Sequence, residues 1–251
     1  MVEQLTVTER DLRRLLDIID RGREAGPEEE FPREVMRALA DLVPADDITF
    51  QRSRPLDREF VAAEEVTELP TDDLGEGWED IFWRSYWASE ACSRPQRTGD
   101  YDTVWKVSDY LSRPQLVNSA KGEWFRLTGM HSEITVPFPA HGAEDRRLML
   151  FRATSRDFTE RERLLLRMLR PHFLEIHRDL ELRRAGIPEL TDRQWQLLRL
   201  VAAGDSNTQI ARRLFVAEGT VRKHLENIYD RLGVTSRTAA VATAFPLAHT
   251  A

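Results

Sequence analysis

The sequence lacks the features that mark secreted and membrane proteins. It has one cysteine, Cys92, so no internal disulfide framework can form. Its apolar stretches, such as 238–245, are far too short to cross a bilayer. Residues 1–4 do not show the basic and apolar segments of a secretory signal. These absences predict a protein of the reducing cytoplasm with no membrane segment.

Motifs of catalysis and metal binding are equally scarce. The sequence shows no nucleophile–base signature, phosphate-cradling glycine loop or paired-carboxylate motif, which argues against an enzyme. The histidines have no ligand spacing with cysteine or carboxylates, and His172 and His177 lie five apart on a predicted helix, poorly placed for one ion. We therefore expect no catalytic residues, no metal site and no cofactor.

Composition and charge indicate a folded chain with two dissimilar parts. The 251 residues are 41% hydrophobic and 31% charged, which excludes a mostly disordered protein and fits one large or two small domains. The net charge of −7 by itself argues against a nucleic-acid ligand. However, residues 189–251 carry eight bases and six acids, so the acidic excess lies in the N-terminal part.

Residues 1–157 alternate between helical and strand-like patterns. Helices come first, followed by strands near 48–50 and 60–66, more helices, and a hairpin of 132–138 with 146–152. This order predicts an α+β domain in which helices pack on an antiparallel sheet.

Three local expectations belong to this domain. A helix capped by Thr8 is expected to bury one apolar stripe, which consists of Leu12, Leu15, Leu16 and Ile19. One helix is expected to run from Ser112 through Phe125, and a strand is expected at 103–107.

A long helix is predicted from about Phe158 to Arg184, opened by a capping box of Thr159 and Glu162. Pro171 is expected to kink or divide it, because proline removes a backbone donor. Its apolar residues form a short heptad seam, which either packs on its own domain or pairs with a second copy: Leu166, Leu169, Phe173, Ile176 and Leu180.

The segment after this helix marks a domain boundary. Gly186 and Pro188 end the helix. The predicted organisation is thus an N-terminal domain over 1–157, a connecting helix and linker over 158–187, and a C-terminal domain over 188–251.

The C-terminal domain shows the pattern of a helix-turn-helix. Capping boxes at 191–194 and 206–209 open two helices, and a third, 219–232, hides an apolar stripe of Val221, Leu225, Ile228 and Leu232. Two short helices joined by a tight turn, with polar residues exposed on the second, suit the major groove of DNA. The exposed face carries Gly219, Lys223, Glu226, Asn227 and Asp230, with Thr220 and Arg222 at its flanks.

Several short motifs make this pattern specific. In order and spacing they resemble the LuxR-type (GerE-like) DNA-binding domain from Leu190 to about Phe245, and the resemblance implies an all-α four-helix domain of a bacterial transcription regulator. Its recognition helix would be 219–232, and its final helix would mediate dimer contacts on DNA. The motifs are Leu190-Thr191-Asp192-Arg193, Gly204-Asp205-Ser206-Asn207, Ile210-Ala211, Thr220-Val221-Arg222-Lys223-His224, Asn227-Ile228, Leu232-Gly233-Val234 and Ser236-Arg237.

The resemblance also implies roles for individual residues. Arg222, Lys223 and Glu226 occupy positions that contact bases or nearby phosphates, and Asn227 shares their face. Arginine and lysine can donate to guanine, and glutamate can accept from cytosine. For Glu226 a simple pair with Arg222 at i, i+4 is about as well supported. Positions of contact with the DNA backbone are Asn207, Thr220 and Arg237.

Two departures from the family pattern bear on stability. Ala217 stands at the N-cap of the recognition helix where serine is usual, a loss of about 1 kcal/mol of helix stability. Gln194 replaces the usual glutamate of the first helix.

The N-terminal domain is similar in its order of elements to GAF/PAS-like sensory domains. A phosphorylation receiver is disfavoured, because no acidic cluster follows a first strand, and an acyl-homoserine-lactone pocket remains open by analogy with one branch of the family. Aromatic residues at helical spacing are more often core than ligand site. The first candidates for a small-molecule pocket are Trp83, Trp87, Trp105 and Trp124.

The sequence thus predicts a cytoplasmic bacterial regulator that binds a two-fold-symmetric DNA operator as a homodimer and senses an unknown signal, for which a small molecule is one candidate. The alternative is a protein-interaction module whose helix-turn-helix docks on RNA polymerase or another regulator.

Overall fold

Two compact units make up the chain, and they are described separately. The division falls between His177 and Arg178, inside a helix predicted to connect the domains. The computed structural model describes residues 5–67, 74–139, 142–188 and 190–245. Among these residues, every helix is too short or too polar to cross a lipid bilayer.

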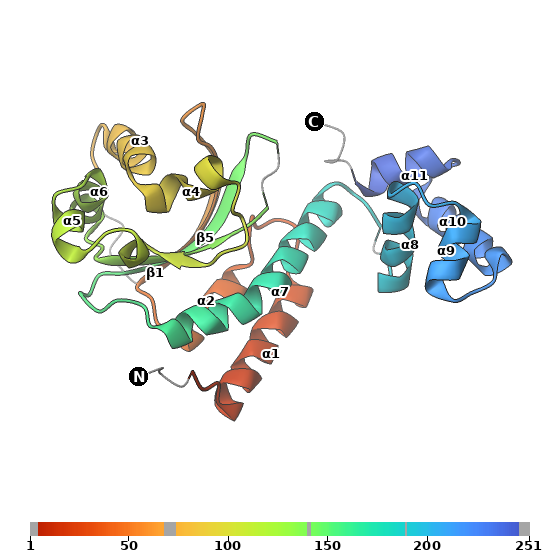
Figure 1. Ribbon diagram of the computed structural model, residues 1–251, viewed down its shortest axis with the longest axis horizontal. Helices are drawn as coiled ribbons and strands as arrows, with labels where there is room; N and C mark the ends of the chain where they lie inside the picture. Colours follow the sequence, from red (N-terminus) through yellow and green to blue (C-terminus); the bar gives the residue numbers. More distant parts are fainter. Residues whose placement is uncertain (1–4, 68–73, 140–141, 189, 246–251) are drawn as a thin grey trace. The chain divides into compact units, whose positions relative to one another are not determined.

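The N-terminal unit is an α+β domain with helices packed on a sheet, as the sequence predicted, and its elements form three layers (Figure 1). All neighbouring strands of its sheet are antiparallel, in the order β2-β1-β5-β4-β3. Helices α3 to α6 lie over one face, and α1, α2 and α7 lie over the other (Figure 1). Along the chain the elements are α1 (Glu9–Glu24), α2 (Arg33–Leu42), β1 (Asp47–Arg54), β2 (Glu59–Thr67), α3 (Trp78–Ala88), α4 (Glu90–Thr98), β3 (Trp105–Lys106), η1 (Val107–Asp109), α5 (Arg113–Val117), α6 (Ala120–Thr128), β4 (Ser132–Pro137), β5 (Asp145–Arg152) and α7 (Glu160–Arg184).

The two faces of the sheet differ in chemistry because side chains alternate along each strand. On the α7 side, the ring of Phe50 lies 5.1 Å from Phe31 and 5.2 Å from Phe138, and Phe173 of α7 lies 5.7 Å from Phe31. These rings form an apolar core. The intervening positions of β1 are polar and face α3 and α6, where Gln51 is only 7% exposed. Strand β1 therefore presents an apolar core residue to α7 and polar side chains to α3 and α6, where Met149 and Phe151 of β5 add apolar surface.

Helix α1 begins where predicted but buries a different face. Thr8 and Asp11 form its capping box, and Arg161 of α7 also pairs with Asp11. The expected stripe is wrong in two positions, since Leu12 is 46% and Leu16 is 62% exposed. Because Asp11 is buried in this polar contact, the helix is turned so that Asp11, Leu15, Ile18 and Gly22 face inward.

The segment from Ser112 through Phe125 is two helices, not the single one expected. The chain folds back so tightly that a side chain on Gly122 would overlap the carbonyl oxygen of Leu116. Ser119 then caps α6, accepting a hydrogen bond from the Gly122 amide at 3.1 Å. The predicted strand at 103–107 is shorter too, because Val107 already begins the 3-10 turn η1.

Helix α7 is not divided by Pro171, contrary to one of the expected outcomes. It is continuous over its 25 residues, and its capping box of Thr159 and Glu162 is confirmed. Proline removes one hydrogen bond, but burial of Leu165, Leu166, Leu169 and Phe173 supplies far more stabilisation than that bond.

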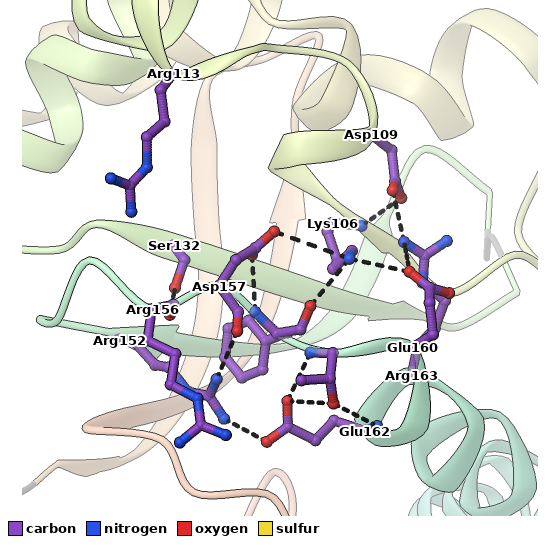
Figure 2. Close-up of polar contacts among 12 residues, drawn as sticks. Lys106, Asp109, Arg113, Ser132, Arg152, Arg156, Asp157, Glu160, Glu162 and Arg163 are labelled. Atoms are coloured by element: carbon purple, nitrogen blue, oxygen red, sulfur yellow. Dashed lines mark hydrogen bonds and ion pairs between the residues drawn. The ribbon is translucent and has the colours of Figure 1, made fainter. Parts of the chain in front are cut away.

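A polar cluster fixes the first turn of α7 to the sheet (Figure 2). Arg152 of β5 pairs with Glu162 at 2.7 Å and donates to the carbonyl oxygens of Pro44 and Asp157. Lys106 donates to the Phe158 carbonyl at 2.9 Å and to the Glu160 carboxylate at 3.0 Å. The start of the helix is therefore held by strands β3 and β5.

The C-terminal unit is the predicted four-helix domain. The capping boxes of Thr191 with Gln194 and of Ser206 with Gln209 are confirmed. Gly204 takes the left-handed conformation expected after the first helix, with φ of 86°. Its helices are α8 (Asp192–Ala202), α9 (Asn207–Leu214), α10 (Glu218–Leu232) and α11 (Arg237–Ala244).

Candidate functional site

Helix α10 is held in place by the stripe that the sequence identified. Val221 and Ile228 are fully buried, Leu225 and Leu232 are nearly so, and all four belong to one core with side chains of α8, α9 and α11. Gly233 ends the helix in the left-handed conformation. The N-cap is Ala217, whose side chain accepts no hydrogen bond, so the first turn of α10 lacks a side-chain cap.

The opposite side of α10 is exposed. Arg222, Lys223 and Glu226 lie in solvent, as do Thr220 and Asn227. Within the part of the chain that the structure describes, none of these side chains makes a hydrogen bond or an ion pair; in particular, Arg222 and Glu226 are not paired. The face thus presents free donors and acceptors on a rigid helix.

Asn207 and Arg237 are brought together from different helices. The Arg237 guanidinium donates to Oδ1 of Asn207 at 3.2 Å and also to the carbonyl oxygen of Asp205. Both residues are half-buried, at the first turns of α9 and α11. The contact orients the guanidinium at the amino end of α9, where backbone N–H groups also favour anions.

A second candidate site is a cavity of about 840 Å³ in the N-terminal unit, between the polar face of the sheet and helices α3 and α6. Six aromatic side chains of the described residues line it: Phe60, Trp78, Phe82, Tyr86, Trp124 and Phe151. Phe82 lies 4.8 Å from Phe60, 6.1 Å from Tyr86 and 5.2 Å from Trp124, and Trp78 lies 5.3 Å from Phe60 and 6.2 Å from Trp124. The rings form a continuous apolar wall.

The four tryptophans singled out in the sequence have different places. Trp124 lines the cavity. Trp83 is buried behind the lining, 4.9 Å from both Phe60 and Phe82, and Trp87 stacks edge-on against Tyr86. Trp105 is not part of the lining and is buried in a core with Phe125. The structure therefore brings only Trp124 of this set to the cavity surface, and the other rings come from Phe60, Trp78, Phe82, Tyr86 and Phe151.

Charged side chains on the polar face are buried and joined to each other. Arg147 of β5 donates to Asp145 at 2.6 Å, to the Tyr86 hydroxyl at 2.9 Å and to the Cys92 carbonyl at 3.0 Å. Burial raises the pKa of Tyr86 well above its usual range. Lys121 of α6 pairs with Glu133 of β4 at 2.5 Å, and both are at most 4% exposed.

Asp47, at the start of β1, is the exception. It is 5% exposed and lines the cavity, and Thr49 donates to its Oδ2 at 3.0 Å. Its Oδ1 is buried and faces no N–H or hydroxyl donor among the described residues, and Nε2 of Gln51 likewise has no partner there. Burial, followed by the charge of the neighbouring Glu65 carboxylate and a side-chain hydrogen bond shared with it, raises the pKa of Asp47 to about 7.

Sequence reasoning missed these charged residues. The alternation of β1 was visible, but polar residues on alternate positions ordinarily face solvent. No signal in the sequence showed that α3 and α6 would cover them.

No metal centre is visible in the described ranges, where no three histidine, cysteine or acidic side chains cluster as ligands would. Cys92 is a free, buried thiol at the cavity wall.

Comparison with known proteins concerns chiefly the C-terminal unit. Residues 188–244 match the family model described as "Bacterial regulatory proteins, luxR family". Over 79 residues the chain is 44% identical to the HTH-type transcriptional regulator MalT of Yersinia pestis and equally to that of Yersinia enterocolitica. This region is 29% of the chain and only 9% of each MalT.

Two solved structures resemble larger parts of the chain at low identity. SdiA in complex with octanoyl-rac-glycerol has a TM-score of 0.44 and 18% identity, covering 96% of this chain and 97% of SdiA. The VqsR LBD domain from Pseudomonas aeruginosa has a TM-score of 0.46 and 16% identity, covering 68% of this chain and 94% of that domain. By its own fold and by the match of its sequence, the segment 188–244 is a DNA-binding helix-turn-helix domain of the luxR family.

Proposed function

We propose that the protein is a sequence-specific DNA-binding transcription regulator that acts as a dimer, with an N-terminal domain that senses a small molecule. The observation that carries this proposal is the exposed polar face of α10, in a domain that matches the luxR family. An α-helix fits the major groove, and its exposed side chains can reach base edges there.

The exposed face of α10 has the chemistry of base readout. Arg222 and Lys223 are cations in solvent, able to donate to guanine O6 and N7 or to a phosphate. Glu226 is one turn further along, where a carboxylate would accept from cytosine N4. Because Glu226 is not neutralised by Arg222, phosphates would repel it unless it faces a base.

The DNA backbone would be held beside this face. Thr220 lies in the first turn of α10, and Asn207 lies in the first turn of α9. Arg237, fixed by its hydrogen bond to Asn207, would add a positive charge for phosphate. These contacts orient the domain without reading sequence.

A dimer follows from the geometry of operators. Paired helix-turn-helix domains read half-sites about one helical turn apart, which gives two-fold-symmetric sites. The sensory part would comprise residues 1–157, a GAF/PAS-like domain with the aromatic cavity as its ligand site. A ligand there would act on DNA binding through 158–187, because α7 begins in the polar cluster on β3 and β5 (Figure 2).

The test is DNA binding by the full chain. Fluorescence anisotropy with genomic fragments should identify a two-fold-symmetric sequence that the protein binds. The protein bound at each site should have the apparent mass of two chains. Affinity should fall steeply with salt, because released counterions supply much of the binding free energy. No binding to any fragment, or binding that salt leaves unchanged, would contradict the proposal.

A second candidate is a protein-interaction module that docks on RNA polymerase or another regulator. Phe215 favours it: this side chain is 96% exposed at the turn before α10, with a positive φ of 55°. An exposed aromatic ring on a turn is a common anchor in protein interfaces. Substituting Phe215 by Asn should leave DNA affinity unchanged and weaken only such an interaction.

A further inference from the structure

Building on the proposed sensory role of the cavity, we propose that its ligand is a cationic amine: a small molecule with an aromatic or apolar body and a protonated amino group that binds the carboxylate of Asp47. The inference rests on three features of the described residues. These are the charge balance of the lining, the burial of Asp47 and the aromatic wall.

Among the described residues that line the cavity, no basic side chain pairs with Asp47. Of the bases that line it, Lys121 is paired with Glu133 and Arg147 with Asp145. Arg126 is exposed and donates to the carbonyl oxygen of Val117 at 2.8 Å. Asp47 therefore has no cation beside it, and its charged neighbour is another acid, Glu65.

Because no cation of the described chain lies beside Asp47, burial is unfavourable for the charged form of its carboxylate. Asp47 is 5% exposed and, unlike Asp145 and Glu133, has no basic side chain paired with it among the described residues; its neighbour is the acid Glu65. A buried carboxylate is stable when a cation or several donors satisfy it. A ligand with an ammonium group would supply both the charge and the donors, whereas an anionic ligand would add repulsion.

The remainder of the cavity suits the body of such a ligand. Phe151 lies opposite Asp47 in the register of β1 and β5, and Trp124 packs against the cluster that contains Phe151. From there the wall continues through Phe82 to Tyr86. Aromatic faces attract cations as well as apolar groups, and aromatic sites are a common way to bind amines.

Gln51 adds a polar contact away from Asp47. It lies four residues further along β1, on the same face, which corresponds to a separation of about 13 Å along the strand. Its unpartnered amide nitrogen is a donor. A ligand that extends along the wall from Asp47 would therefore place a hydrogen-bond acceptor near Gln51.

The experiment compares two probes of nearly equal shape, 4-phenylbutylamine and 4-phenylbutanol, by calorimetry on the full chain without DNA. It is done at about pH 8, above the raised pKa of Asp47 of about 7, so that amine and carboxylate are both charged. The amine should bind about tenfold or more tightly than the alcohol, as expected for a charge-assisted hydrogen bond.

Two variants locate the contact. In Asp47→Asn, which keeps the shape and the acceptor for Thr49, the amine should bind no better than the alcohol. Asp80→Asn, the same change at an exposed position of α3 outside the lining, should keep the preference. The comparison in the unaltered chain does not depend on how either variant folds.

Equal affinity for the two probes, or a preference that Asp47→Asn leaves intact, would overturn the assignment of an amine ligand. Neither result would contradict the cavity as a ligand site. Binding of neither probe would overturn both the assignment and the cavity as a ligand site. Operator binding is measured separately, so its failure would contradict the proposed regulator without bearing on the amine.

Discussion

On α10, Arg222, Lys223 and Glu226 lie in solvent and make no hydrogen bond or ion pair within the described residues, whereas around the N-terminal cavity Arg147 and Lys121 are buried and paired. Burial without a partner is costly for a charge, so the cavity charges must be satisfied within the fold. Exposed charges cost little to leave free and are available to a partner. Free charges therefore mark the surface that meets DNA in our proposal, and in the cavity Asp47 is a buried acid with no cation of the described residues beside it.

The largest expected effect concerns the buried, paired charges of the N-terminal unit. Arg147→Ala should lower the free energy of unfolding by about 3–5 kcal/mol, because it leaves the Asp145 carboxylate buried without its cation. Urea denaturation of the N-terminal transition measures this. The matched change on the reading helix, Arg222→Ala, should alter stability by no more than about 0.5 kcal/mol. Similar losses in both variants would remove the distinction.

The next effect concerns the pH dependence that Asp47 introduces. Its pKa rises from 3.8 to about 7 on folding, so its contribution to stability is full below about pH 4 and is lost as the pH rises through 7. Asp47→Asn should therefore be more stable than the unaltered protein at pH 8, by at most about 4 kcal/mol, and equal to it near pH 4.

The other charged groups that line the cavity act on both proteins and cancel in this comparison: Glu79, Lys121, Arg126, Glu133 and Arg147. Glu65 shares a hydrogen bond with Asp47 and titrates together with it, so the pH dependence belongs to this pair of carboxyl groups. Thermal melts across this pH range give the result. A difference in stability that stays constant with pH would show that Asp47 is not the titrating group.

A smaller effect concerns the exposed charged side chains of α10. Lys223→Ala should weaken operator binding by about 1–3 kcal/mol and relax sequence preference at one base pair if Lys223 reads a base. If it contacts only phosphate, affinity should fall equally for all sequences, with a shallower salt dependence. Arg199→Ala, on α8 outside the helix-turn-helix, is the control. Unchanged affinity and preference in Lys223→Ala would refute the assignment.

The smallest effect concerns the missing cap. Ala217→Ser should stabilise the C-terminal unit by about 1 kcal/mol, because a serine hydroxyl can accept from the first turn of α10. Ser206→Ala should remove the equivalent cap from α9 and cost a similar amount. Calorimetric melting of the full chain measures both. Stability that does not respond to Ala217→Ser would mean that this first turn is satisfied in another way.

The sequence was most informative where contacts are short in range. The capping boxes of Thr159, Thr191 and Ser206 each join residues three apart, and the buried stripe of α10 repeats within single turns. Patterns of this kind are fully present in the local sequence. They predicted the four helices of the C-terminal unit and the hairpin of β4 and β5.

The errors arose where a distant residue decides the outcome. The face that α1 buries depends on the contact of Asp11 with Arg161, which is 150 positions away. The helix expected from Ser112 through Phe125 is broken by the close approach of Gly122 to the Leu116 carbonyl. Amphipathic patterns alone do not contain these contacts.

By itself, therefore, the sequence determined an α+β domain joined to a helix-turn-helix, and it determined which side of α10 is polar, since both follow from periodicity and capping along one stretch of chain. The tertiary structure decided which polar residues of β1 are buried and which have partners. Lys121 meets Glu133, and Asp47 meets no cation, only because α6 and the strands fold over one another. Pairing of charges across elements depends on packing, which no local pattern records.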